Sequence, residues 1–195
     1  MAKVFPLYTK DDRTNAQNYR PVSVLPAISK ICERVVYDQL LLYSNGLLTK
    51  KQSGFRRLHS TVTALLHLTN NWYLNIDKGM TNLIVLLDLA KAFDTVSHNI
   101  LFKKLQLYGL KSVTLDWFSS YLSDRQQQCV EEGCVSKPQL ISCGVPQGSI
   151  LGPLLFLIYI NDLPRCLPHT KAHMTMPMIP RYMRPLYPLL NYMPR

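Results

Sequence analysis

An aspartate, Asp88, ends a continuous apolar run at residues 83–87, LIVLL. An unbroken apolar run is typical of a strand that is buried on both faces, so residues 82–89 are predicted to form such a strand. A carboxylate at the end of a buried strand is costly unless a metal ion or another partner compensates its charge. Asp88 could therefore bind a metal ion, cap a following helix or pair with Lys91, and the residue alone leaves these alternatives open.

A second segment that could carry chemistry is GVPQGS at residues 144–149, with LGPL at residues 151–154. Gly144 and Gly148 would let the backbone approach another molecule closely, because glycine has no side chain. The segment could also be a simple turn between a strand and a helix. Its composition and order favour a functional loop over that simpler interpretation.

The two segments resemble motifs A and B of the reverse transcriptase domain of LINE-type, non-LTR retrotransposons. Residues 86–96 resemble motif A and residues 144–149 resemble motif B. Shorter segments agree with this family in the same order along the chain, from the first residues to residue 174. They are NYRPVS (18–23), SKICER (29–34), QSGFR (52–56), YGL (108–110) and YINDL (159–163).

The resemblance implies roles for individual residues. Asp88 would bind both catalytic Mg²⁺ ions, and the carbonyl of Leu89 would assist it. Phe93 would act as a steric gate against the ribose 2′-hydroxyl. Gln147 and Gly148 of motif B would lie against the nucleotide and the templating base pair.

The family also implies partners. These are an RNA template, a DNA primer and deoxynucleoside triphosphates, joined by two-metal nucleotidyl transfer. Three basic residues are the candidates to approach the incoming triphosphate, although each could equally be an ordinary surface charge: Arg20, Lys30 and Arg56.

One expected part of the catalytic site is missing from the sequence. Two-metal chemistry needs several carboxylates around two divalent ions. The family supplies further carboxylates from a Tyr-Ala-Asp-Asp hairpin, motif C, which should follow Met174, where the sequence reads TMPMIP. No Asp or Glu occurs after Asp162, so nothing downstream can substitute.

The codons of this stretch allow a specific explanation. If each codon takes the third base of one present codon and the first two of the next, Met176 and Pro177 must give Ala, and Met178 and Ile179 must give Asp. The neighbouring codons then permit Tyr, Asp and Thr, so the shifted reading can be Tyr-Ala-Asp-Asp-Thr. Our hypothesis is that a small insertion or deletion near residue 174 shifted the frame, which makes residues 175–195 an out-of-frame tail. The coding DNA tests this: a third base other than T in the codon of Thr175, or other than G in that of Pro177, would exclude it.

Composition limits the setting of the protein. The formal net charge is +10, from 22 Lys and Arg against 12 Asp and Glu, which suits a polyanionic partner such as nucleic acid. The five cysteines lack the spacing of a zinc site, and free thiols are expected. No signal peptide is evident, and the longest apolar run, residues 150–160, is too short to cross a bilayer. We expect an intracellular protein, cytoplasmic or nuclear, with no membrane and no obligate protein partner.

The predicted fold class is α+β, with reverse-transcriptase-like fingers, an incomplete palm and the thumb absent. Residues 1–174 would form this partial domain. Strands are expected at residues 4–8 and 82–89, with a hairpin over 126–143. Helices are expected at residues 27–43, 59–77, 95–109, 112–122 and 149–162. In the first of these helices, Ile28, Ile31, Val35 and Leu42 recur at helical spacing and predict its apolar face.

The functional prediction is an RNA-directed DNA polymerase that has lost activity with its Tyr-Ala-Asp-Asp motif. Two alternatives remain open at this point. The chain could be a non-catalytic nucleic-acid-binding remnant, or the product of a pseudogene without a selected role.

Overall fold

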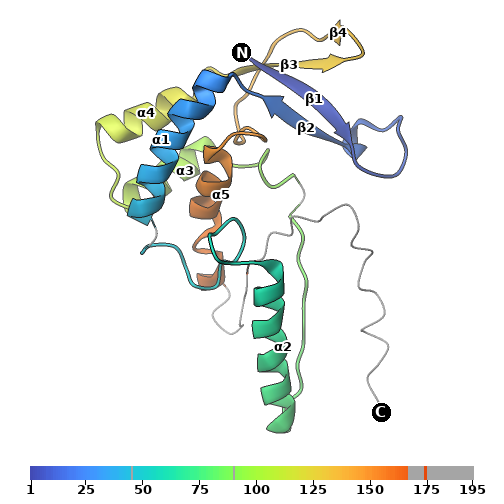
Figure 1. The fold of residues 1–195 in the computed structure, drawn as a ribbon, viewed down its shortest axis with the longest axis vertical. Coiled ribbons are helices and arrows are strands. Elements are labelled where there is room, and N and C mark those ends of the chain that lie inside the picture. Colours follow the sequence, from blue (N-terminus) through green and yellow to red (C-terminus); the bar gives the residue numbers. More distant parts are fainter. Residues whose placement is uncertain (45, 90, 167–173, 175–195) are drawn as a thin grey trace.

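The structure is a computed structural model that describes residues 1–44, 46–89, 91–166 and 174. It is a mixed α/β fold in which helices gather on one side and a small sheet lies on the other (Figure 1). The strands are β1 (Ala2–Tyr8), β2 (Tyr19–Val24), β3 (Gln126–Glu131), β4 (Cys134–Val135) and β5 (Gln139–Leu140). The helices are α1 (Ala27–Ser44), α2 (Thr61–Asp77), α3 (His98–Leu107), α4 (Val113–Leu122) and α5 (Leu151–Ile160). Two short 3-10 helices, η1 (Ala16–Asn18) and η2 (Leu163–Arg165), complete the set.

The sheet joins the N-terminal segment to residues 126–140. Its order is β2-β1-β3-β4, and β5 pairs with β3 on the edge opposite β1. β1 and β2 form an antiparallel hairpin, whereas β1 and β3 are parallel, with Ala2 opposite Gln127 and Val4 opposite Cys129. This parallel pairing connects the N-terminal segment with residues more than a hundred positions away in sequence, so the β1–β2 hairpin and strands β3 to β5 form one sheet.

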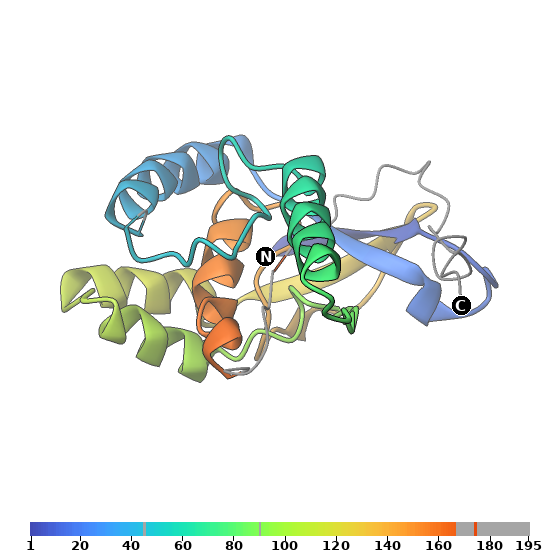
Figure 2. The ribbon, with the colours of Figure 1, turned by 90° about the horizontal axis from the view of Figure 1, so that it is seen from below.

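The hydrophobic core forms around α5. This helix is apolar on every side, and its buried residues include Leu151, Leu155 and Ile158. α1 and α3 pack directly against it, and α4 packs against α3 (Figure 2). A helix that is hydrophobic all round must be covered all round, so the cluster of α1, α3 and α4 follows from the composition of α5.

Most of the predicted elements are confirmed. All five predicted helices are present, with ends shifted by at most three residues. Ser60 caps α2 through a capping box with Thr63. The predicted hairpin turns at Glu132 and Gly133, between β3 and β4. Residues 175–195, predicted to form the tail, lie outside the described residues.

The predicted strand at residues 82–89 is wrong. These residues have no regular secondary structure, and their side chains are exposed: 91% for Leu83, 69% for Val85 and 90% for Leu86. A strand needs a neighbour to bond its backbone. No described strand pairs with this segment, so the sequence signal for a buried strand has no sheet to join.

The predicted apolar face of α1 is also wrong. Ile28, Ile31, Val35 and Leu42 are exposed, Ile28 by 76% and Leu42 by 82%. The buried face instead carries Leu40 together with two polar residues, Glu33 and Ser44. Glu33 has a partner just before α5, as described below, and Val36, Tyr37 and Leu41 of the same helix pack against the core.

One helix stands apart from the core. α2 projects from the body, and residues 80–89 run back along it (Figure 1). Asn82 holds this segment against α2. Its amide nitrogen donates to the carbonyl of Trp72 at 3.0 Å, and its amide oxygen accepts from the side chain of Asn75 at 2.7 Å. Only Ala64 of α2 is buried. Among the helices that the structure describes, none is long and apolar enough to cross a membrane.

Candidate active site around the two motifs

The loop predicted as motif B packs against the end of the segment predicted as motif A. The amide of Gly144 donates to the carbonyl of Val96 at 2.7 Å, and the amide of Val145 donates to the carbonyl of Phe93 at 2.8 Å. Gly144 has φ +89°, and a Cβ there would lie 2.9 Å from Cα of Asp94. This position therefore requires glycine for both its backbone angle and its close approach.

Gln147 connects the loop to its surroundings on two sides. Its amide nitrogen donates to both carboxylate oxygens of Asp94, each at 3.0 Å, and its backbone carbonyl accepts from the amide of Ser23 at 2.7 Å. Gly148 has φ +106°, and a Cβ there would lie 2.5 Å from the carbonyl oxygen of Ser23. The loop is thus held between β2 and the turn at residues 91–95.

A pocket of about 260 Å³ opens beside this loop. Asp94, Arg125 and Gln147 contribute polar side chains to its lining, and Leu140 and Pro146 contribute apolar surface. The pocket lies at the junction of motif B, β2 and the residues after β3. Asp88 is not among its lining residues.

Asp88 and Leu89, the predicted metal ligands, lie on the exposed segment beside α2. The described ion pairs are Lys10–Asp11, Arg34–Asp38 and Lys104–Asp162, so Asp88 does not pair with Lys91. Within residues 1–44, 46–89, 91–166 and 174, no group of three His, Cys, Asp or Glu side chains could hold a metal ion. The described residues therefore do not fit a two-metal site.

Phe93, the predicted steric gate, is half-buried at the edge of the core. Its ring lies 5.9 Å from that of Phe55 in an edge-to-face arrangement and 5.2 Å from that of Phe156. Aromatic contacts of this kind stabilise packing beyond the apolar area that they bury. Phe93 thus links the turn within motif A with α5 and with the segment that contains Phe55.

The three predicted basic residues are not equivalent. Arg20 on β2 and Lys30 on α1 have exposed side chains. Arg56 is half-buried, and one of its guanidinium nitrogens donates to the carbonyls of Thr49 at 2.9 Å and Gln52 at 3.3 Å. These bonds give Arg56 a structural role in closing its own turn.

Comparisons with known proteins identify the family. The sequence profile of the family described as "Reverse transcriptase (RNA-dependent DNA polymerase)" matches residues 8–183. The chain belongs to the reverse transcriptase family. It is 35% identical over 156 residues to the probable RNA-directed DNA polymerase from transposon BS of Drosophila melanogaster, covering 76% of this chain and 16% of that protein.

Two further relatives are mobile-element proteins. One is the RNA-directed DNA polymerase from mobile element jockey of Drosophila melanogaster, 32% identical over 162 residues, with 82% of this chain and 18% of that protein covered. The other is the Pol polyprotein from the type-1 retrotransposable element R2 of Popillia japonica, 31% identical over 159 residues, with coverages of 80% and 22%. The resemblance to non-LTR retrotransposon reverse transcriptases is confirmed, and the chain spans about a fifth of these relatives' length.

A buried carboxylate to which the sequence analysis gave no individual role holds the end of motif B. Glu33 on α1 is only 2% exposed. One of its oxygens accepts from the amide of Ile150 at 2.6 Å, just before α5, and the other accepts from the hydroxyl of Tyr121 at 2.9 Å. Burial and the Glu33 carboxylate raise the pKa of Tyr121 well above its usual range, so this hydroxyl stays protonated and donates. Glu33 thus joins α1, α4 and α5.

The segment YINDL also serves the framework. Asn161 accepts from the amide of Thr49 at 2.7 Å and donates to the carbonyl of Leu47 at 3.0 Å. Lys104 of α3 forms an ion pair with Asp162 at 2.5 Å, and this hydrogen bond holds the pKa of Asp162 below its usual range. Motif residues at both ends of α5 therefore fasten it to its neighbours.

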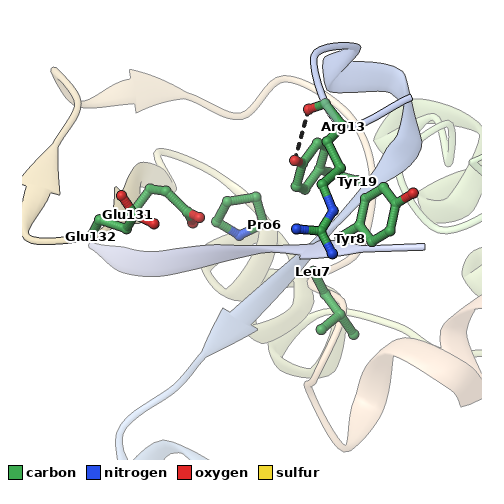
Figure 3. Close-up of a pocket in the computed structure, with 7 residues that line it drawn as sticks. All are labelled: Pro6, Leu7, Tyr8, Arg13, Tyr19, Glu131 and Glu132. Atoms are coloured by element: carbon green, nitrogen blue, oxygen red, sulfur yellow. Dashed lines mark hydrogen bonds between the residues drawn. The ribbon is translucent and has the colours of Figure 1, made fainter. Parts of the chain in front are cut away.

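A second pocket, of about 500 Å³, lies far along the β1–β2 hairpin and contains none of the predicted site residues (Figure 3). The guanidinium of Arg13 lies 5.0 Å from the centre of the Tyr8 ring, and the hydroxyl of Tyr19 donates to the carbonyl of Arg13 at 2.8 Å. Glu131 and Glu132 lie across the pocket from these rings.

We predict that Glu33→Ala destabilises the fold strongly. It would leave the amide of Ile150 and the hydroxyl of Tyr121 without their partner, at about 1–3 kcal/mol for each buried group. Urea unfolding followed by circular dichroism would measure the loss. Glu131→Ala, at an exposed position on β3, is the matched control and should stay within about 0.5 kcal/mol of the parent. Equal effects of the two substitutions would contradict this role for Glu33.

Proposed function

We propose that this chain carries the framework of a non-LTR retrotransposon RNA-directed DNA polymerase but does not catalyse DNA synthesis as it stands. The observation that carries the proposal is the position of Asp88. Its carboxylate is exposed on an unpaired segment, and the described residues offer no cluster of metal-binding side chains. Two-metal nucleotidyl transfer depends on several carboxylates fixed around the ions, and a single exposed carboxylate binds divalent metals poorly.

The residues that we propose for this site are those that the family resemblance indicates. Asp88 and Leu89 would be the metal ligands of an intact relative, with Mg²⁺ as the metal. Phe93 would be the gate, and Gln147 and Gly148 would contact the nucleotide. The firm packing of Phe93 and of the motif B loop supports this proposal, because a binding surface needs side chains that are held in place.

We also propose that residues 1–174 correspond to fingers and an incomplete palm, and that residues 175–195 are an out-of-frame tail. The codon argument supports the second point. The backbone of Met174 supports the first, since it bonds to both Lys51 and Ser53 at 2.9 Å and so brings residue 174 against the body.

A nucleic-acid-binding remnant is the second candidate. The net charge of +10 and the exposed side chains of Arg20 and Lys30 favour it, because phosphate neutralisation needs accessible cations. An RNA template, a DNA primer and deoxynucleoside triphosphates are the partners that the family suggests. Arg56 contributes less to this proposal, since two backbone carbonyls already engage its guanidinium.

We predict that the full chain incorporates no deoxynucleotides above background in a primer-extension assay. The assay contains an RNA template, a DNA primer, all four deoxynucleoside triphosphates and Mg²⁺. The physical reason is the lack of a carboxylate cluster that could hold two ions. An active reverse transcriptase run in parallel shows that the assay works.

Asp88→Asn is the matched control for contamination. Incorporation by the parent chain that disappears in Asp88→Asn would overturn the proposal of inactivity. Binding of labelled RNA, measured in the same preparations at two salt concentrations, tests the second candidate. A nucleic-acid-binding remnant shows salt-dependent affinity for RNA that falls when Arg20 and Lys30 are both replaced by Gln. A chain that has retained no binding role shows no such affinity.

A further inference from the structure

Residues 83–87 expose apolar side chains and pair with no strand of the described chain. Residues 83–87, LIVLL, are extended beside α2, and none of their backbone groups takes part in a described hydrogen bond outside regular elements. The segment contains no Pro, Gly or charged residue, the features that natural proteins use to protect a strand edge. It also has the length and composition of a segment that pairs readily with another strand.

We propose that residues 82–88 form an antiparallel strand pair with the same residues of a second copy of this chain. The pair would be centred on Val85, so that Val85 faces its own counterpart across a two-fold axis. Leu83 would then face Leu87, Ile84 would face Leu86, and Asn82 would face Asp88. Such an interface is self-complementary and closes after two copies.

Charge selects the antiparallel arrangement, and the polar ends of the segment, Asn82 and Asp88, then complement each other in a second copy. A parallel, in-register pair would place the two Asp88 carboxylates side by side, which is destabilising. The antiparallel pair instead places each Asp88 opposite Asn82. The amide nitrogen of Asn82 has two hydrogens and uses one for the carbonyl of Trp72, so the other can donate to the carboxylate.

α2 supplies the layer that such a pair needs. A two-stranded ribbon alone is only marginally stable in water, whereas strands packed on a helix are more stable. α2 runs beside the segment and presents exposed apolar side chains, among them Leu65, Leu66 and Ile76. Two copies would therefore bring together two strands and two helices, and each would cover apolar surface that is open in one copy.

The sheet of the same chain is not the partner in the structure. Its strands lie on the other side of the body from the far end of α2 (Figure 1). Residues 175–195 are also poor strand partners on sequence grounds, because Pro177, Pro180, Pro185 and Pro188 each remove a backbone donor.

Oligomeric state tests the proposal directly. Light scattering coupled to size exclusion, applied to the full chain over a range of concentrations, should show a monomer that passes to a dimer. Val85→Lys and Val85→Glu should each raise the dissociation constant of the dimer at least ~10-fold, because each places two like charges directly opposite one another. An equimolar mixture of the two variants should restore dimers, since the charges facing each other are then opposite.

Leu107→Lys is the matched control. Leu107 is 86% exposed on α3, away from the segment, and this variant should associate like the parent. A parent that stays monomeric, or a Val85→Lys variant that dimerises like the parent, would overturn the proposal. So would open-ended assemblies instead of dimers, or a mixture of the two Val85 variants that remains monomeric.

Discussion

The helix α5 imposes the main constraint on this fold. Its apolar character on every side requires cover from all directions, and α1 and α3 provide it together with the motif B loop that leads into the helix. The backbone amide of Ile150, directly before α5, donates its hydrogen bond to a buried carboxylate. Glu33 supplies this acceptor and draws Tyr121 of α4 to the same place. One buried carboxylate therefore fixes the start of α5, the inward face of α1 and the position of α4.

Most local elements could be predicted from the sequence because their signals are local. The capping box at Ser60, the turn at Gly133 and the apolar run of α5 each lie within a few neighbouring residues. The roles of Gly144 and Gly148 were predictable in kind, as close approaches of the backbone. Their actual neighbours, Asp94 and Ser23, were not predictable, since they come from distant parts of the chain.

The failures share one physical cause, which is dependence on a distant partner. Residues 82–89 have the composition of a buried strand, but composition does not provide the neighbouring strand that would bury it. The predicted burial of Ile28, Ile31 and Val35 is wrong for the same reason. The opposite side of α1 faces the core, where Glu33 accepts a hydrogen bond from the distant amide of Ile150. Glu33 lies in the segment SKICER that resembles the family, but its burial could not be predicted, since a carboxylate on a helix is usually a surface charge.

The sequence match over residues 8–183 places the chain in the reverse transcriptase family. The loop at residues 144–149 is packed and hydrogen-bonded to the body, whereas Asp88 lies on an exposed segment outside this packed part. Hydrogen exchange of backbone amides tests this separation most directly, at a concentration where the chain is monomeric. The account predicts rapid exchange for residues 83–89 and strong protection for α5 and the buried turns of α3. Equal protection of residues 83–89 and α5 would contradict it.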